Sequence, residues 1–324
     1  MGKYDAPIDL RKGTDTGLLI EKISPNSSVL EFGCAEGRMT RYMKESLNCM
    51  VCIVELDRES FSKAMLYADE GVCCDACTLE WTKAFEGKHF DYILFADVLE
   101  HLQQPDLVLK SAASFLKEDG QVLVSIPNIG HADVICALLC NRFRYTETGL
   151  LDNTHIHFWG REDFHDFAEN AGFSVVEENA IYKVPNTTEQ AINSRELSAE
   201  TKLLVASMPY TNVYQFVFTL QKRSWVEQNK IPEISLIESA ADTGAEMDAI
   251  SGILRNLRQE KEEAEEQLAH YRDEYLTALS QRDDIALRLS EAQKAYSEIE
   301  NSKFWKITKP FRACIDLIKG SGKK

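Results

Sequence analysis

The 324-residue sequence has no long apolar run. No segment approaches the ~18 consecutive apolar residues typical of a bilayer-spanning helix. Residues 1–15 are polar, unlike a signal peptide, and Ala6 stands where a myristoylation signal has serine or threonine. We therefore expect a cytoplasmic protein.

Basic charge is scarce except at one end of the sequence. The net charge is −16, yet residues 301–324 contain seven lysines and arginines and a single acid, Asp316. An acidic body disfavours nucleic acid as a partner, because affinity for nucleic acid comes largely from basic residues that neutralise phosphates. The basic end is a separate feature.

The nine cysteines lack the pattern of a disulfide framework and suit a reducing compartment. Cys49 with Cys52, and Cys74 with Cys77, have the spacing of zinc-ribbon ligands. However, Cys49 and Cys52 flank and enter a predicted strand, where residues three apart point to opposite faces. We expect buried cysteines and no metal site.

Short apolar runs alternate with helical patterns from residue 29 to about residue 222. This alternation is typical of an α/β fold with a doubly wound, mostly parallel sheet. The last run could pair antiparallel at the sheet edge. The seven predicted strands are 29–32, 50–56, 71–74, 90–96, 120–127, 173–179 and 213–221.

Residues 129–160 interrupt the alternation with a segment rich in aromatic residues and histidine. An insertion at this point lies above the carboxyl ends of the strands, where sheets of this class bind ligands. We interpret it as a substrate lid; the alternative is a packing excursion without a chemical role. The helical pattern at 187–207 either completes the lid or connects the last strands.

Acids and glycines mark the ends of the first three predicted strands. Glu31 ends the first strand and precedes Gly33 and Gly37, and glycine lets a ligand approach the backbone closely. The glycines lack the G-x-G-x-x-G spacing of dinucleotide enzymes. Glu55 ends the second strand, where an acid can accept hydrogen bonds from ribose hydroxyls. Asp75 follows the third, where it could accept one from an adenine amino group.

These motifs resemble those of class I S-adenosylmethionine (SAM)-dependent methyltransferases over residues 25–222. The resemblance implies a Rossmann-like, seven-stranded sheet in a domain of residues 1–222 and SAM as the cofactor. Ala35 departs from the family's usual central glycine; an alternative is a degenerate fold that no longer binds cofactor. The residues that the resemblance assigns to the cofactor are Glu31, Gly33, Cys34, Gly37, Glu55, Asp75, Ala76, Asp97, Val98 and Leu99.

Two further resemblances concern the acceptor. The domain looks like the branch that contains the quinone-biosynthesis O-methyltransferases. Residues 142–164, RFRYTETGLLDNTHIHFWGREDF, are similar to methyltransferase domains associated with bacterial surface-polysaccharide biosynthesis. Residues 302–312, SKFWKITKPFR, resemble a short element at the ends of glycan-assembly proteins. The last two imply a glycan or nucleotide-sugar acceptor and glycan-assembly enzymes as partners.

Methyl transfer to a hydroxyl requires a base, and histidine suits this role near neutral pH. His155 is the preferred catalytic candidate and His101 the second, although each could have a structural role instead. His155 and His157 lie two apart, so they share a face if the segment is extended. The candidate substrate-binding residues are Asn128, Tyr145, Asp152 and His157.

The rest of the sequence has three predicted parts. Residues 223–246 are predicted to be a linker. Residues 247–300 carry an a and d pattern over more than seven heptads, which predicts a coiled coil and a homo-oligomer; the alternative is a lone charged helix. Residues 301–324 mix aromatic and basic residues, which is typical of peripheral contact with a membrane; the alternative is packing on the coil or a partner protein.

We therefore expect an O-methyltransferase that acts on a sugar hydroxyl in bacterial surface-glycan biosynthesis, at the inner membrane face. One alternative is a small-molecule or quinone-type O-methyltransferase, which a lid pocket lined by apolar groups would favour. The other is a coiled-coil scaffold or glycan length-gauge with a vestigial methyltransferase domain.

Overall fold

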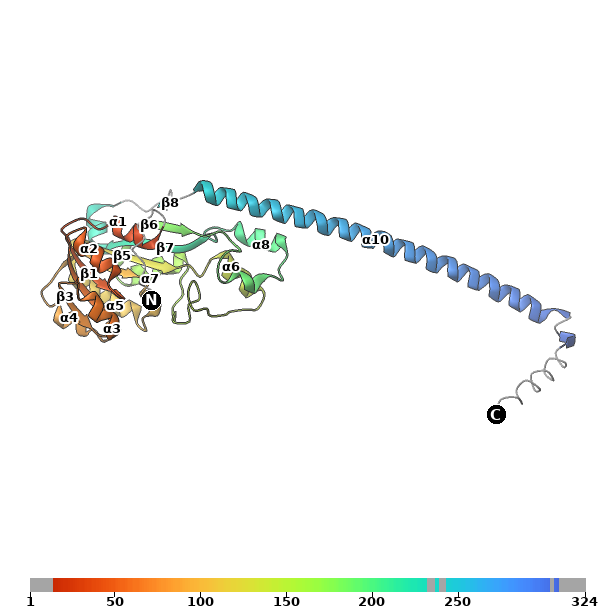
Figure 1. The fold of residues 1–324 in the computed structure, drawn as a ribbon, viewed down its shortest axis with the longest axis horizontal. Helices are drawn as coiled ribbons and strands as arrows, with labels where there is room; N and C mark the ends of the chain where they lie inside the picture. Colours follow the sequence, from red (N-terminus) through yellow and green to blue (C-terminus); the bar gives the residue numbers. More distant parts are fainter. Residues whose placement is uncertain (1–13, 232–236, 239–242, 304–305, 309–324) are drawn as a thin grey trace, which may run out of the picture. The chain divides into compact units, whose positions relative to one another are not determined.

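The computed structural model describes residues 14–231, 237–238, 243–303 and 306–308 (Figure 1). Within these ranges, residues 237–238 and 243–264 are described by their backbone alone. The prediction for residues 1–13 and most of that for the basic end lie outside the described residues. The chain divides into two units, residues 1–253 and 254–324.

All seven predicted strands are present, with bounds that differ by up to four residues. Most are buried along their length, because their apolar runs lie between two layers of helices. The strands are β1 (Ser28–Phe32), β2 (Met50–Glu55), β3 (Glu70–Cys73), β4 (Phe90–Ala96), β5 (Leu116–Pro127), β6 (Phe173–Tyr182), β7 (Val213–Lys222) and the two-residue β8 (Ile237–Glu238).

The strands form one mixed sheet in the order β3-β2-β1-β4-β5-β7-β6-β8. The first five pair in parallel, and β7 pairs antiparallel with both β5 and β6. The antiparallel pairing predicted for the last run is confirmed, but its place at the edge is wrong. Because β7 is apolar and buried along nearly its whole length, it requires a neighbour on each side.

The predicted linker contains regular structure. It holds α9 and the two residues of β8, which pair in parallel with β6 and give the sheet an eighth strand. The first residues of α10 also lie within it.

Helices cover both faces of the sheet. On one face, α1, α2 and α3 contribute apolar side chains to a cluster with Val51 and Leu94; on the other, α4, α5 and α7 pack against Phe32 and Phe95. The helices of this unit are α1 (Asp15–Glu21), α2 (Arg38–Glu45), α3 (Arg58–Ala64), α4 (Glu80–Ala84), α5 (Pro105–Ala112), α6 (Ala132–Leu139), α7 (Arg161–Asn170), α8 (Ala199–Ala206) and α9 (Arg223–Asn229), with short 3₁₀ turns η1 (Ala76–Thr78), η2 (Leu99–His101), η3 (Ala113–Phe115) and η4 (Ala191–Ser194).

The predicted lid begins with α6, which has His131 as its N-cap. The His131 ring accepts a hydrogen bond from the Asp133 backbone N–H, and its Nε2 lies 3.0 Å from the Lys183 carbonyl oxygen. The Asp133 carboxylate in turn accepts hydrogen bonds from the Thr188 backbone N–H and hydroxyl. The start of the lid is therefore joined to the segment between β6 and β7.

The long helix α10 (Thr243–Asn301) spans the predicted coiled-coil region. The large apolar side chains at its described a and d positions are exposed, so a coiled coil stays a prediction. Among the described residues, no helix combines the length and apolar character of a membrane span.

Candidate active site

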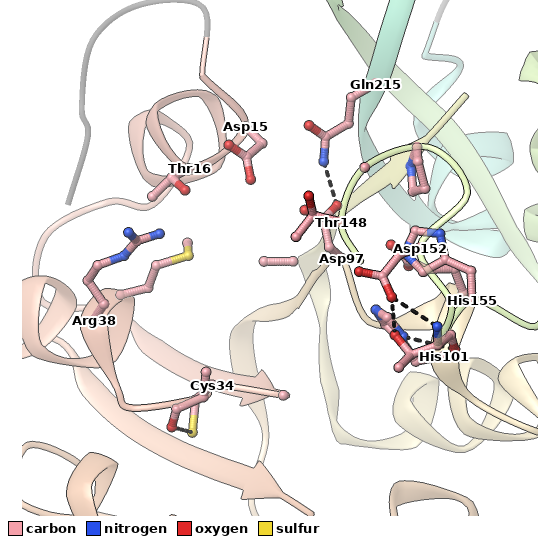
Figure 2. A pocket seen from close by; sticks show the side chains of 18 of the residues that line it. Asp15, Thr16, Cys34, Arg38, Asp97, His101, Thr148, Asp152, His155 and Gln215 are labelled. Carbon is pink, nitrogen blue, oxygen red and sulfur yellow. Dashed lines mark hydrogen bonds between the residues drawn. The ribbon is translucent and has the colours of Figure 1, made fainter. Parts of the chain in front are cut away.

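A cavity of about 400 Å³ lies at the carboxyl ends of β1 and β4 (Figure 2). This volume is in the usual range of small-molecule sites. Of the predicted site residues, Glu31, Gly33, Cys34, Asp97, His101, Asp152 and His155 line it. It is also lined by Asp15, Thr16, Ala35, Glu36, Arg38, Met39, Ala96, Glu100, Pro127, Thr148, Gly149, Thr154, Tyr214 and Gln215.

The loop after β1 is built from alternating left-handed residues. Gly33, Ala35 and Gly37 have φ of 63°, 49° and 80°. A Cβ at Gly33 would lie 2.7 Å from a methyl carbon of Val98, so only glycine fits there without a shift. Ala35, the departure from the family pattern, adopts the same left-handed region at a cost of about 1 kcal/mol.

Glu55 holds this loop in place from the end of β2. Its two carboxylate oxygens accept hydrogen bonds from the backbone N–H groups of Ala35 at 2.8 Å and Asp57 at 3.0 Å. The side chain lies beside the cavity, next to a residue that lines it. The role of Glu55 as the ribose-binding acid stays a prediction.

Five other residues assigned to the cofactor do not line this cavity. Asp75 accepts a hydrogen bond from the Cys77 N–H as the N-cap of η1, and the Ala76 carbonyl accepts one from the Trp81 indole at 2.9 Å. Val98 is buried against Gly33, and Leu99 lies in the core. Gly37 begins α2 as its N-cap and likewise does not line the cavity.

Glu31 is a buried acid at the cavity wall, only 3% exposed. The Thr40 hydroxyl donates a hydrogen bond to its Oε2 at 2.6 Å. Burial raises the pKa of Glu31 to about 7, and the charge of Glu55 adds to this effect. In the absence of ligand, Glu31 is therefore partly protonated near neutral pH.

The raised pKa of Glu31 predicts that the difference in the free energy of unfolding between the wild type and a Glu31→Gln variant depends on pH. The folded protein keeps the Glu31 proton up to about pH 7, whereas the unfolded chain loses it near the ordinary value of 4.5. As pH rises from 4.5 to 7, the free energy of unfolding of the wild type should fall relative to the variant by up to about 3 kcal/mol. Urea unfolding across this range without SAM measures the difference, and a constant difference would contradict the prediction.

Asp97 adopts a left-handed conformation, with φ of 52°, directly after β4. Its carboxylate accepts hydrogen bonds from the Ser125 hydroxyl at 2.8 Å and from the Gln215 amide (Figure 2). Burial raises its pKa to about 7, with a further contribution from Asp15. Gln215 is not among the predicted site residues, although a glutamine within the apolar run of β7 is a signal that the sequence offers.

The lid reaches the cavity through a turn that is bonded to η2. The Glu100 carbonyl accepts hydrogen bonds from the Ile156 and His157 backbone N–H groups at 2.9 and 3.1 Å. Asp152 is buried, and its Oδ1 accepts hydrogen bonds from the Thr154 backbone N–H and hydroxyl at 2.9 and 2.7 Å.

The two candidate catalytic histidines lie together. The rings of His101 and His155 are 4.8 Å apart, edge to face. His101 Nδ1 lies 3.2 Å from the Thr154 carbonyl oxygen, and His155 Nδ1 lies 3.4 Å from that of Leu150. Because a carbonyl only accepts, each Nδ1 would donate in its contact.

Three predicted substrate residues lie elsewhere. His157 stacks on Trp159 outside the cavity, so the expected shared face with His155 is not found. Tyr145 is 52% exposed and packs against Phe143. The Asn128 side-chain amide donates hydrogen bonds to the Tyr210 and Val213 carbonyls and accepts one from the Gly130 backbone N–H. These bonds to the backbone give the Asn128 side chain a structural role.

The structure also bears on the metal expectation. Cys49 and Cys52 pack into the clusters on opposite faces of the sheet, as the spacing argument requires. A different set of possible metal ligands lies close together: Glu100, His101 and His155 have donor atoms within 4.8 Å of one another. Burial and the charges of Asp97 and Asp152 raise the pKa of Glu100 well above its usual range.

The family is shown by a comparison of the sequence. The sequence model of a family described as "Methyltransferase domain" matches residues 10–178, more than half of the chain. The chain belongs to this family. Its domain is a SAM-dependent methyltransferase domain, and SAM is the cofactor that the cavity has to accommodate.

Individual relatives match only in part. Phosphoethanolamine N-methyltransferase 1 of Zea mays is 30% identical over 114 residues, covering 33% of this chain and 22% of that protein. The ubiquinone biosynthesis O-methyltransferase of Parvibaculum lavamentivorans is 29% identical over 100 residues, covering 31% and 40%. The chain thus spans well under half the length of these curated relatives.

A solved SAM-dependent methyltransferase from Archaeoglobus fulgidus is 16% identical, with a TM-score of 0.46 over 65% of this chain and 95% of that one. The solved structure of a protein from Bacillus halodurans, described as a proposed methyltransferase, is 17% identical, with a TM-score of 0.44 over 64% of this chain and 97% of that one. Likeness at this level identifies no acceptor.

The charge of the cavity fits SAM, which carries a sulfonium and an ammonium group. Six acidic side chains line the cavity against one guanidinium, that of Arg38, although burial raises the pKa of three of them, Glu31, Asp97 and Glu100. Opposite charges within a few ångströms stabilise each other strongly in a partly buried site. Glu31, Gly33 and Asp97 would hold the cofactor from the ends of β1 and β4, with Glu55 behind the loop.

Proposed function

We propose that the protein transfers the methyl group of SAM to a hydroxyl group of a sugar, within a glycan or nucleotide sugar of bacterial surface-glycan biosynthesis. The observation that supports a polar acceptor is the lid side of the cavity. Apart from Gly149, the lid residues that line it are polar: Thr148, Asp152, Thr154 and His155. A quinone ring would favour apolar walls, since pockets for such ligands are mostly apolar.

The side chains have distinct parts in this proposal. Bound SAM supplies an electrophilic methyl group on its sulfonium. The His155 imidazole accepts the proton of the acceptor hydroxyl, with His101 beside it as the second candidate. Asp152, oriented by Thr154, accepts a hydrogen bond from a neighbouring sugar hydroxyl.

A quinone-type or amine acceptor is the second candidate. It is supported by the partial similarity to the ubiquinone biosynthesis O-methyltransferase and to the phosphoethanolamine N-methyltransferase. Both similarities cover about a third of this chain, so the methyl-transfer assay described below has to identify the acceptor.

The proposal includes a homo-oligomer formed through α10. Seven large apolar side chains at predicted a and d positions are exposed in the single chain, and a second copy would bury them. They are Leu268, Tyr271, Tyr275, Ile285, Leu289, Tyr296 and Ile299. The proposal also places the protein in the cytoplasm, docked at the inner membrane face through residues 301–324 beside glycan-assembly enzymes.

The test is a methyl-transfer assay with isotopically labelled SAM and a panel of acceptors. The panel holds nucleotide sugars, cell-surface glycan fragments, a demethylated quinone precursor and phosphoethanolamine. We expect label only in the sugar-containing acceptors. Label in the quinone or the amine alone would replace the proposed acceptor, and no label with a SAM-binding, folded protein would favour the scaffold alternative.

A further inference from the structure

Glu100 is an unusual buried acid in the wall of the cavity. Its side chain is fully buried, and among the described residues neither carboxylate oxygen has a hydrogen-bond partner. A buried carboxylate without a partner costs several kcal/mol if it is ionised, so such groups are paired, protonated or bound to a metal ion. Glu100 therefore requires an explanation that the fold alone does not supply.

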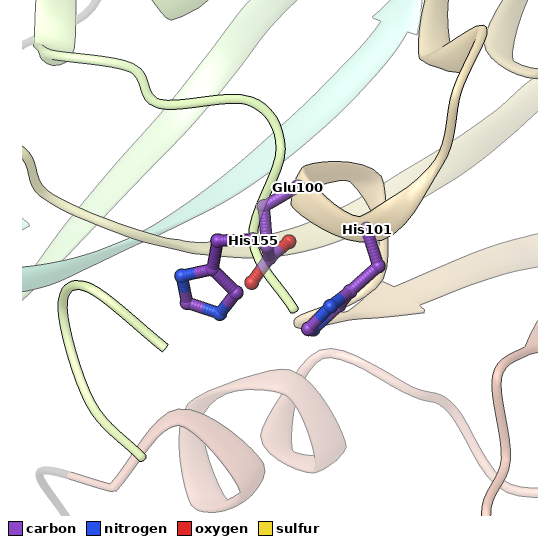
Figure 3. Close-up of side chains that lie close together, drawn as sticks. All are labelled: Glu100, His101 and His155. Atoms are coloured by element: carbon purple, nitrogen blue, oxygen red, sulfur yellow. The ribbon is translucent and has the colours of Figure 1, made fainter. Parts of the chain in front are cut away.

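Two imidazoles flank this carboxylate. Figure 3 shows the His101 and His155 side chains on either side of Glu100, and the three donor atoms lie within 4.8 Å of one another. His101 and Glu100 come from η2, whereas His155 comes from the lid. Two segments that are far apart in sequence thus contribute to one cluster.

Each imidazole also contacts a backbone carbonyl. His101 Nδ1 lies 3.2 Å from the Thr154 carbonyl oxygen, and His155 Nδ1 lies 3.4 Å from that of Leu150. Metal-binding histidines commonly have this arrangement, with one ring nitrogen bound to the ion and the other donating to a carbonyl or carboxylate.

We infer that Glu100, His101 and His155 form a binding site for a divalent transition-metal ion of the zinc type. Two imidazoles and one carboxylate are a ligand set for Zn²⁺ in catalytic sites, with a further position open to water or substrate. Ligand bonds of ~2.0–2.2 Å would bring the donor atoms to about 3.4 Å from one another. Closing this gap requires a shift of the exposed His101 side chain.

The role of the ion rests on the proposed function, but its binding does not. All three ligands line the cavity, so the open position would face the acceptor. A hydroxyl bound to the ion has a lower pKa and loses its proton to water more readily. The oxygen then forms a bond to the methyl carbon as the carbon–sulfur bond breaks, with the electron pair left on sulfur. In this arrangement the ion, rather than the His155 imidazole, activates the acceptor.

The test measures metal binding without SAM or acceptor. Metal-stripped full-length protein is titrated calorimetrically with Zn²⁺, and Co²⁺ is used as a spectroscopic probe. We expect one ion per chain with a micromolar or lower dissociation constant, and a visible Co²⁺ spectrum without the sulfur charge-transfer band that cysteine ligands would give. Substoichiometric binding, or a sulfur band, would overturn the inference.

Variants locate the ion. Glu100→Gln and His101→Gln should each weaken binding at least tenfold, whereas His89→Gln, which removes an exposed imidazole outside the cavity, should leave it unchanged. His101→Gln serves as the second variant because the exposed side chain can change without disturbing the core. Equal affinity in all variants would contradict the site. Full methyl transfer by metal-free protein would leave the proposed function intact and refute the role of the ion.

Discussion

A Glu55→Ala variant is expected to bind SAM at least 100-fold more weakly than the wild type. The carboxylate anchors the loop after β1 through the Ala35 N–H and stands where the family's ribose-binding acid is expected. The two ribose hydroxyls of SAM are expected to donate hydrogen bonds to this charged carboxylate, and each such bond contributes about 1.5–3 kcal/mol. Each 1.4 kcal/mol changes the dissociation constant about tenfold. Loss of the loop anchor adds to this effect.

Titration calorimetry with SAM measures the change. The matched control is Glu45→Ala, which removes an exposed acid on α2 that pairs only with Arg41 among the described residues. This control should retain wild-type affinity. Equal affinity of Glu55→Ala and the wild type would show that the acid at the end of β2 does not serve the cofactor.

Gly37→Ala is expected to destabilise the domain by about 3 kcal/mol. Gly37 has φ of 80°, and a Cβ there would lie 2.6 Å from the Cα of Ala64 at the end of α3. The left-handed conformation costs about 1 kcal/mol for alanine, and a collision with backbone in a packed interface costs about 1–3 kcal/mol more. The start of α2 would have to move, and with it the loop at the cavity.

Gly87→Ala separates the two contributions. Gly87 has nearly the same φ, 79°, but a Cβ there would have nothing within 4 Å. This variant should lose only the conformational part, about 1 kcal/mol. Urea unfolding followed by tryptophan fluorescence measures both variants, and equal losses would contradict the close packing of Gly37 on α3.

The strands and the loop after β1 were predictable because their signals are local. A short apolar run followed by an acid and glycines, as at residues 29–37, specifies a strand and its turn without reference to the rest of the chain. The position of β7 in the sheet, in contrast, was not predictable from a local signal. Its apolar run predicted a strand, but its place between β5 and β6 depends on which neighbours bury it.

The lid part of the site was only partly predictable. Its position over the strand ends followed from the order of elements. The hydrogen bonds of the Ile156 and His157 N–H groups to the Glu100 carbonyl, after which His157 lies outside the cavity, did not follow from an alternating pattern. Asn128 shows the same limit, because its hydrogen bonds are to the Tyr210 and Val213 carbonyls, more than 80 residues away. Such contacts form only when the lid and β7 meet in the folded chain.

The most direct test of the account is calorimetric titration of the full chain with SAM and with its demethylated product, S-adenosylhomocysteine. The account predicts one site per chain with a micromolar dissociation constant for each. A folded protein that binds neither compound would contradict the cofactor site and, with it, the methyltransferase activity.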